Sequence, residues 1–148
     1  MLLSLNIMPI TEAHLETLNK ALGQSGLRST RQREVVYGVV AVAKDHPTAD
    51  EIFARSRQEM PTISLATVYN CLETLNDCSL IRQVNFERES TRYEPNLQPH
   101  AHFYCDKSGR VMDVQLPDEL FSKLKNLLPQ TASVSSIELN FRGNMPQS

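Results

Sequence analysis

The hydrophobic positions in the first half of the chain recur every three or four residues, which predicts a series of amphipathic helices. The first helix covers 11–23, with its apolar face at Leu15, Leu18 and Leu22. The second opens at Ser29 or Thr30, where the run from Ser29 to Gln32 resembles a capping box. Its inward positions are Val35, Val36, Val39 and Val40.

Two further helices follow. The third begins with Thr48 and has Glu51 three residues later, which is a second capping box, and Pro61 ends the segment. Its apolar positions are Ile52 and Phe53. The fourth starts at Ser64 and carries one apolar stripe, formed by Leu65, Val68, Leu72 and Leu75.

After residue 78 the pattern changes to short β segments. LIRQVNF and TRYE flank the polar turn ERES, so a hairpin follows the helices, as in a winged helix-turn-helix. The two prolines of PNLQPH then mark an inter-domain connection. The sequence predicts a winged-helix DNA-binding domain over 1–94, a hinge over 95–100 and a second domain over 101–148.

The second domain has a mixed pattern, so the fold class is α+β. It is expected to contain strand HFYC, turn DKSG, strand RVMDV, a helix from Pro117 to Leu128 and a final strand SIELNFR. The buried stripe of the helix would be Leu120, Leu124 and Leu127, and the final strand alternates Ile137, Leu139 and Phe141. About 50 residues bury little surface alone, so this domain is expected to complete its core by pairing with a second copy as a homodimer.

Composition restricts the choice of partners and compartment. The net charge of -2 over 148 residues gives no global sign of a nucleic-acid partner, so any DNA contact must be local. The first 14 residues lack the pattern of a signal peptide or membrane span, which predicts a cytoplasmic protein without a membrane partner. Cys71 and Cys78 would lie about 10 Å apart along one helix, beyond disulfide reach, which fits a reducing compartment.

A small cluster in the second domain has the chemistry of a metal site. His100 and His102 are two apart on a strand and therefore share one face. If DKSG is a four-residue hairpin turn, Cys105 pairs with Arg110 and His102 pairs with Asp113. Two imidazoles and a carboxylate suit iron(II), manganese(II) or zinc. Taken alone, this pattern more often describes paired surface histidines that bind no metal.

Five blocks resemble, in order and spacing, the ferric uptake regulator family. They are GLRSTRQREVV, HPTADEIF, PTISLATVYNCLETL, RYE and HAHFYCDKSGRVMDV, and the resemblance runs from about residue 20 to the C-terminus. HPTADEIF and the Asn70 that follows Tyr69 are most similar to the peroxide-responsive branch. The resemblance implies a repressor, not an enzyme, that binds operator DNA, an AT-rich palindrome, and controls peroxide-stress or iron-homeostasis genes.

The predicted fourth helix has the features of a recognition helix. Ser64, Thr67, Tyr69 and Asn70 fall away from its apolar stripe and can reach phosphates or base edges. The resemblance implies that Tyr69 contacts bases, and that Arg28 and Arg31 contact the DNA backbone. The alternative is an ordinary solvated polar face.

The resemblance adds His46 and Glu94, both from the first domain, to the candidate ligands His100, His102 and Asp113. Iron(II) or manganese(II) bound by all five would clasp the two domains, and zinc can occupy the site in vitro. By resemblance, His46 and His100 are the histidines that peroxide would oxidise. Glu94 stands where the peroxide-responsive branch typically carries Asp, and this favours a plain iron or manganese sensor as the alternative.

The structural zinc site of the family is expected to be missing. The first of its two CxxC pairs reads Cys105, Asp106, Lys107, Ser108, and the second reads Met145, Pro146, Gln147, Ser148. One thiolate, one thioether and two hydroxyls do not make a tight zinc site. Two rival classes remain open from the residues alone, a non-haem metal enzyme and a metal buffer.

Overall fold

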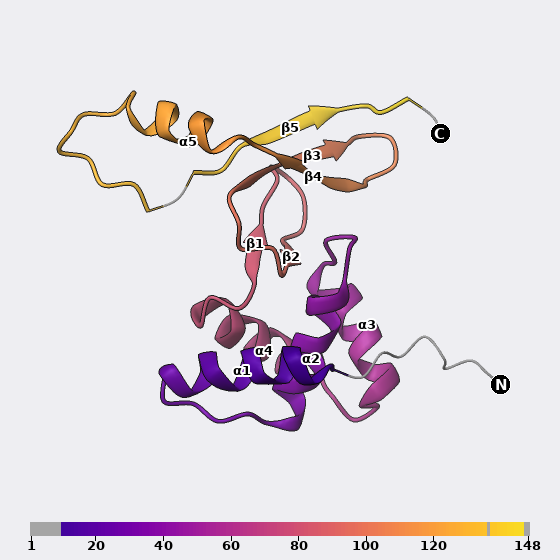
Figure 1. The fold of residues 1–148 in the computed structure, drawn as a ribbon. Helices are drawn as coiled ribbons and strands as arrows, with labels where there is room; N and C mark the ends of the chain where they lie inside the picture. Colours follow the sequence, from indigo (N-terminus) through magenta and orange to yellow (C-terminus); the bar gives the residue numbers. More distant parts are fainter. Residues whose placement is uncertain (1–9, 136, 147–148) are drawn as a thin grey trace. The chain divides into compact units, whose positions relative to one another are not determined.

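The chain divides into two compact units, residues 1–97 and 98–148 (Figure 1). The computed structural model describes residues 10–135 and 137–146. Outside these ranges lie most of the N-terminal segment considered above, and Gln147 and Ser148 of the second CxxC position. Within the described ranges, none of the helices is both long and apolar enough to cross a membrane.

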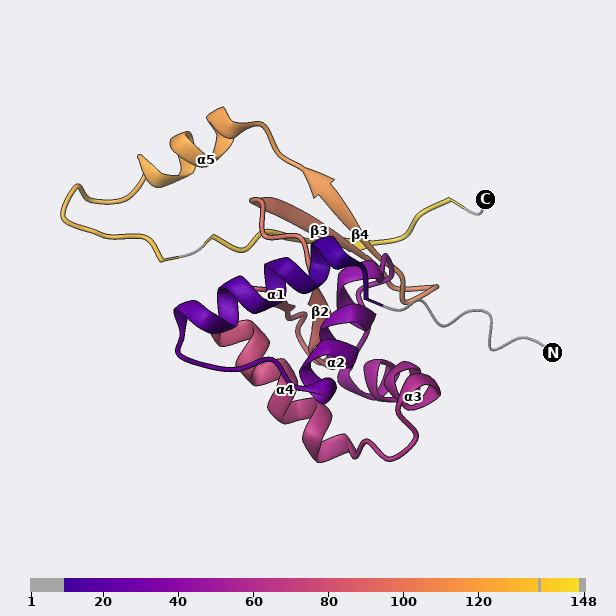
Figure 2. The ribbon, with the colours of Figure 1, turned by 60° about the horizontal axis from the view of Figure 1, so that its bottom comes forward.

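Four helices form the body of the first unit (Figure 2). They are α1 Glu12–Gln24, α2 Arg31–Val42, α3 Ala49–Glu59 and α4 Leu65–Asp77. The predicted capping box of α3 is confirmed, since the Thr48 and Glu51 side chains each accept a backbone N–H at the start of the helix. Ser64 caps α4 as expected, by accepting the N–H of Thr67 at 3.1 Å.

The start of α2 lies at one of the two expected positions, but its cap differs from the predicted capping box. Thr30 is the N-cap, and its hydroxyl accepts the N–H of Arg33 at 3.2 Å, so the capping box from Ser29 to Gln32 is wrong. The hydroxyl of Ser29 instead donates to the Glu34 carboxylate at 2.7 Å. Of two neighbouring hydroxyl residues, the one whose side chain faces the first turn of the helix becomes the N-cap, and here that residue is Thr30.

The core of the first unit lies between the inner faces of these helices. Its largest fully buried side chains include Leu18, Leu22, Val36, Val40, Ile52, Val68, Leu72 and Leu75. Leu65 is the exception to the predicted stripe of α4, because 37% of it is exposed. It is the first residue of the helix, one turn before the apolar face meets the core.

The hairpin that follows α4 pairs β1 Arg82–Val84 with β2 Arg92–Glu94 in antiparallel register. Strand β2 is also joined to the segment before α3, because the N–H of Tyr93 donates to the carbonyl of Pro47 at 2.9 Å. Thr48 and Arg92 form an isolated antiparallel bridge beside that bond. The wing is therefore attached to the start of α3 within this unit.

The second unit is built on a three-stranded sheet in the order β4-β3-β5. Its strands are β3 His100–Cys105, β4 Val111–Gln115 and β5 Asn140–Gly143, with β5 parallel to β3. The predicted hairpin register is confirmed: His102 lies opposite Asp113, and the N–H of Cys105 donates to the carbonyl of Arg110 at 2.9 Å. Strand β5 begins four positions later than predicted, and Ser136 lies outside the described residues.

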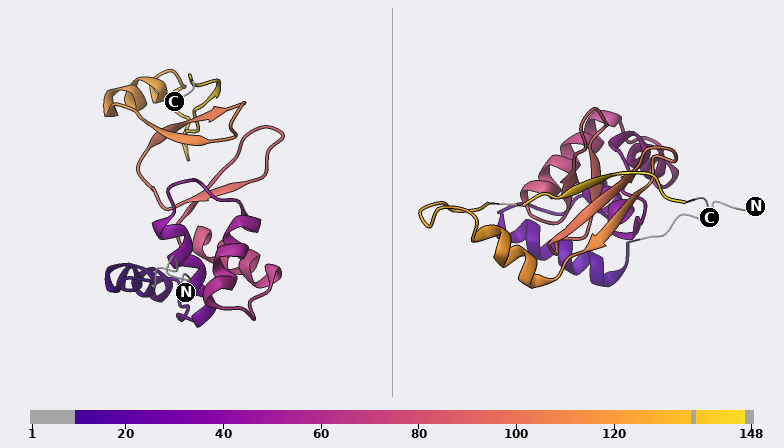
Figure 3. Two further views of the ribbon diagram at one scale, coloured as in Figure 1. Left: turned by 90° about the vertical axis from the view of Figure 1, so that its right-hand side faces the viewer. Right: turned by 90° about the horizontal axis from the view of Figure 1, so that it is seen from above.

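Helix α5, Asp118–Lys125, ends three residues before the predicted Leu128, and no residue of it is buried. Within one chain the predicted buried stripe is wrong: Leu120 and Leu124 are half-buried, and Leu127 is 79% exposed. Figures 1 and 3 show α5 and the segment after it extending to one side of the sheet. The physical reason is that so short a unit has no second layer of its own to cover the helix.

Candidate metal ligands and DNA-facing surface

His46 lies in the short loop between α2 and α3 and has a left-handed backbone, with φ at 53°. Residues other than glycine adopt this conformation uncommonly, although histidine does so more often than most, and such conformations gather at sites where surrounding contacts hold them. Here the guanidinium of Arg92 donates to the carbonyl of His46 at 3.1 Å. On the other side, Arg55 of α3 forms a two-point hydrogen bond to the carboxylate of Asp45.

The contact between Asp45 and Arg55 is electrostatic as well as geometric. The side-chain hydrogen bond from Arg55 is the main cause that holds the pKa of the Asp45 carboxyl below its usual range. The charged carboxylate, favoured near neutral pH, keeps the loop anchored to α3. The backbone around His46 is thus fixed from both flanks.

Glu94 is the last residue of β2, and its side chain meets His46. The Nε2 atom of His46 lies 3.2 Å from Oε1 of Glu94, and the other carboxylate oxygen is 3.9 Å from Nε of Arg82. Attachment of β2 to the segment before α3 brings these two residues together although they are distant in the chain. The first unit therefore presents one imidazole and one carboxylate as a pair.

The second unit presents three donor atoms around one point. The Nε2 atoms of His100 and His102 are 3.0 Å apart, and Oδ1 of Asp113 lies 3.3 Å from the first and 3.5 Å from the second. Strand alternation places both histidines on one face, and the hairpin register places the aspartate opposite. These side chains are arranged by backbone hydrogen bonding within the unit.

The spacing of these three atoms fits ligation of one ion. Two nitrogens that are each about 2.1 Å from a metal, at an angle of about 90–110°, lie about 3.0–3.4 Å apart. In addition, Nδ1 of His100 is 2.5 Å from the carbonyl oxygen of Gln98, which can only accept a hydrogen bond. A proton on Nδ1 leaves Nε2, the atom that faces His102 and Asp113, as the ring nitrogen whose lone pair can bind a metal.

The five ligands predicted from the sequence thus fall into two sets. The structure brings His46 together with Glu94, and it brings His100 together with His102 and Asp113. Each set consists of nitrogen and oxygen donors, which suit iron(II), manganese(II) and zinc.

The predicted DNA-reading residues of α4 differ in exposure. Ser64, Tyr69 and Asn70 are exposed, with Tyr69 at 49%, whereas Thr67 is half-buried. Thr67 is engaged at the helix start, where its hydroxyl accepts a hydrogen bond from the Ser64 hydroxyl at 2.9 Å. Three of the four are accessible to a duplex, and Thr67 shapes the cap that orients them.

Arg28 and Arg31 are both exposed near the start of α2. Arg31 forms an ion pair with Glu59 at 3.3 Å, with just over half of the arginine side chain exposed. The carbonyl of Arg28 accepts a hydrogen bond from the guanidinium of Arg33 at 2.7 Å, which holds the loop before the helix. Exposed ion pairs of this kind contribute little stability, so a phosphate can replace Glu59 as the partner of Arg31 at small cost.

Beside Tyr69 the structure shows a cavity of about 240 Å³ that sequence reasoning missed. Its lining includes Thr48, Ser90, Thr91 and Tyr93. The residues come from the start of α3, the turn of the hairpin and β2, and their spacing along the chain carries no common pattern. In the sequence, only the hydroxyl side chains of the polar turn ERES and of TRYE could have indicated this cavity, because hydroxyl groups often contact DNA phosphates.

The first unit is helical and carries a β wing, and the small α+β unit that follows carries clustered histidine and carboxylate side chains. This combination defines the class of metal-responsive DNA-binding regulators. The model of the ferric uptake regulator family matches residues 24–142. The chain therefore belongs to the ferric uptake regulator family, whose members are dimeric DNA-binding regulators.

Individual relatives agree with this assignment. The peroxide-responsive repressor PerR of Staphylococcus aureus is 34% identical over 106 residues, which cover 72% of each chain. The Campylobacter jejuni peroxide stress regulator is similar in structure, with a TM-score of 0.67, 26% identity, and coverage of 90% of this chain and 96% of the other. The Helicobacter pylori ferric uptake regulator Fur shares the fold at a TM-score of 0.75 and 24% identity, over 90% of each chain.

Proposed function

We propose that this protein is a cytoplasmic, metal-dependent repressor whose dimer binds an AT-rich palindromic operator when one iron(II) or manganese(II) is held by His46, Glu94, His100, His102 and Asp113. The observation that carries the proposal is the triangle of donor atoms formed by His100, His102 and Asp113, with edges of 3.0, 3.3 and 3.5 Å. The pair His46 and Glu94, at 3.2 Å, supplies donors of the same kind from the other unit.

Metal binding would act on DNA affinity through the elements that carry the ligands. His46 precedes α3 and Glu94 ends β2, and both elements belong to the unit that contains the recognition helix α4. An ion bound to both sets of ligands stabilises one orientation of the reading unit relative to the dimerising unit. The population of dimers whose two α4 helices fit adjacent major grooves then increases.

Chelation is expected to remove DNA binding and leave the fold intact. Without the thiolate set of a structural zinc, metal should contribute to domain orientation and not to folding of the second unit. A gel-shift with an AT-rich palindromic duplex should show a shift with Mn(II) that EDTA abolishes, while a circular-dichroism melt of the same samples keeps its main transition. Absence of any metal-dependent shift on promoter DNA would contradict the repressor, and unfolding by EDTA would reveal a structural metal.

Tyr69→Ala is expected to weaken operator binding about 10- to 100-fold, because removal of one base-contacting side chain costs about 1–3 kcal/mol. Tyr69 is half-exposed on α4, so the substitution should leave the melt unchanged. The comparison variant is Tyr37→Phe. Tyr37 lies in the core of the same unit, so this variant should retain DNA affinity. Equal operator affinity for Tyr69→Ala and the unaltered protein, by fluorescence anisotropy, would remove this residue from the interface.

Peroxide is the proposed signal in addition to metal. Peroxide reaction requires an open coordination position at the iron, and this depends on Glu94 binding through one oxygen. Oε1 of Glu94 faces His46, while Oε2 faces Arg82 at 3.9 Å, an arrangement that favours single-oxygen ligation. If Glu94 instead chelates with both oxygens, the protein is a plain iron or manganese sensor.

Mass spectrometry separates these two forms of the proposal. The iron(II)-loaded protein, treated with a small excess of hydrogen peroxide, is expected to gain one oxygen on the peptide that contains His46 or on the peptide that contains His100. The manganese(II)-loaded protein, treated in parallel, is the control and should gain none at these peptides. Iron-loaded protein without the added oxygen would favour simple metal sensing.

A further inference from the structure

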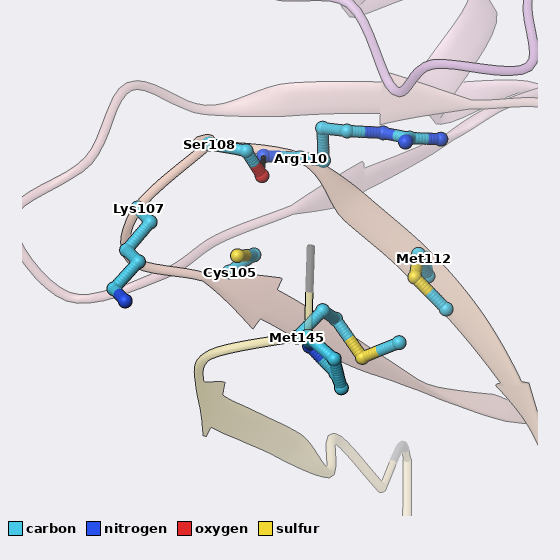
Figure 4. Close-up of a pocket in the computed structure, with 7 residues that line it drawn as sticks. Cys105, Lys107, Ser108, Arg110, Met112 and Met145 are labelled. Atoms are coloured by element: carbon cyan, nitrogen blue, oxygen red, sulfur yellow. Dashed lines mark hydrogen bonds between the residues drawn. The ribbon is translucent and has the colours of Figure 1, made fainter. Parts of the chain in front are cut away.

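A pocket at the end of β3 brings together positions at which the family resemblance implies a structural zinc (Figure 4). Its volume is about 290 Å³, and Cys105, Ser108 and Met145 are among its lining residues. These are three of the four end positions of the two CxxC pairs, and the fourth, Ser148, lies outside the described residues. The Cys105 sulfur accepts hydrogen bonds from the Ser108 hydroxyl and from the backbone N–H of Met145. The fold therefore keeps the place of the zinc site.

The groups around this pocket do not fit a structural zinc ion. Such sites hold zinc by four cysteine or histidine side chains, and Cys105 is the one cysteine in the sequence of the second unit. The Ser108 hydroxyl and the Met145 N–H present hydrogens to its sulfur, whereas a metal ligand must present a lone pair. The protein itself thus meets the hydrogen-bonding demand of Cys105, and the end of β5 must be held in another way.

Arg142 of β5 contacts one residue of β3 and one residue of the turn after it. Its Nε donates to Oδ1 of Asp106 at 2.7 Å, and its guanidinium lies over the ring of Tyr104, 4.5 Å from the ring centroid. Tyr104 is opposite Arg142 in the parallel register, so the two side chains share one face of the sheet. The backbone repeats the connection, since the N–H of Asp106 donates to the carbonyl of Gly143 at 2.8 Å. The last strand is therefore joined to β3 through side chains and backbone at the same point.

The two side-chain contacts of Arg142 reinforce each other. The side chains of Asp106 and Arg142 are 46% and 43% exposed, and such an ion pair alone stabilises a protein little. Tyr104 is buried, so its ring is a fixed surface on which the planar guanidinium can lie while it reaches the carboxylate. The entropy cost of ordering the arginine side chain is incurred once for both contacts. The three side chains can therefore act as one unit.

We propose that Asp106, Arg142 and Tyr104 form a metal-free staple, which holds β5 against β3 in place of the family's structural zinc. The staple supports the strand that carries candidate ligands of the regulatory metal. Strand β3 includes His102, whose N–H donates to the segment that leads into β5 at 3.1 Å. With this staple the second unit keeps its last strand when zinc is scarce. The staple does not require the regulatory metal, so staple formation and operator binding can be tested separately.

Hydrogen exchange of the Asp106 amide reports on the staple, because this N–H donates to β5. NMR measurements on the full-length protein should show the same protection of this amide before and after dialysis against EDTA. Arg142→Gln should make the amide exchange about 3- to 30-fold faster, since one exposed ion pair and one cation–π contact are lost. Arg110→Gln is the matched control. It makes the same substitution at an exposed arginine between β3 and β4, and it should not alter the exchange.

A double-mutant cycle isolates the ion pair within the staple. Asp106→Asn should also accelerate exchange, and the variant with both substitutions should exchange more slowly than the product of the two single effects, because either change already breaks the pair. Arg142→Lys keeps the charge and loses the planar group, so its exchange rate should lie between those of Arg142→Gln and the unaltered protein. NaCl at about 1 M should accelerate exchange in the unaltered protein more than in Arg142→Gln, because salt screens an exposed ion pair.

Three results would overturn the staple. One is an Asp106 amide whose exchange neither Arg142→Gln nor salt alters, and the salt measurement decides this even if that variant does not fold. Another is a double variant in which the two single effects multiply in full, which would show that the two side chains do not act on each other. The third is one equivalent of zinc that survives dialysis against EDTA and is lost in Cys105→Ser together with the protection of the amide. That result would assign the attachment of β5 to a structural zinc.

Discussion

Replacing His102 by alanine is expected to abolish metal-dependent operator binding and to weaken Mn(II) binding by more than about 100-fold. Loss of a residue that only supports a ligand typically costs 10- to 100-fold in metal affinity, so loss of a direct ligand should cost more. His102 is one corner of the donor triangle, and its Nε2 lies 3.0 Å from the His100 nitrogen and 3.5 Å from the Asp113 oxygen. Isothermal titration with Mn(II) and a gel-shift at saturating metal measure the two effects.

A pair of aspartate variants provides the control for this prediction. Asp113→Asn removes a ligand charge with almost no change in shape, and it should reproduce the loss seen with His102→Ala. Asp118→Asn removes the same charge from an exposed position at the start of α5 in the same unit, and it should bind metal normally. If His102→Ala folds and still shifts the operator in a metal-dependent manner, the proposed ligand set is wrong.

Leu72→Ala is expected to lower the free energy of unfolding by about 2–5 kcal/mol, because it leaves a cavity in a packed core. Leu72 is 1% exposed on the inner face of α4, where it belongs to the core that holds the recognition helix. Since stability of a domain is about 5–15 kcal/mol, this loss should also reduce operator binding at 37 °C through partial unfolding. Urea unfolding followed by circular dichroism, in EDTA, measures the change.

Leu65→Ala is the matched control, since it makes the same substitution in the first turn of the same helix. Leu65 is 37% exposed, so the expected loss is below about 1 kcal/mol. Similar losses for the two variants would show that α4 is not anchored through the face that the structure assigns to the core.

Local rules account for the parts of this protein that were predicted correctly from the sequence. The capping box of Thr48 and Glu51 and the cap at Ser64 depend on residues three apart, which a helix start always brings together. The position of Asp113 opposite His102 follows from a four-residue turn and strand alternation. For the same reason, three of the five candidate ligands could be derived without any knowledge of relatives.

Tertiary packing decided the remaining features, because they join residues that no local period relates. His46 and Glu94 meet only since β2 bonds to the segment before α3, and from the sequence they were available through the family resemblance alone. The surroundings of Cys105 depend likewise on the N–H of Met145, which arrives from the segment after β5.

The sequence by itself determined the helix starts, the hairpin register, the α+β class and the chemical character of the ligands, because each of these depends on neighbours within one turn or one hairpin. Burial is different, since it depends on what lies opposite a residue. An apolar stripe predicts a buried face, yet Leu65 is partly exposed at a helix end and Leu127 is 79% exposed on a helix that its own unit does not cover. Only the tertiary structure could decide which apolar positions found a partner within the chain.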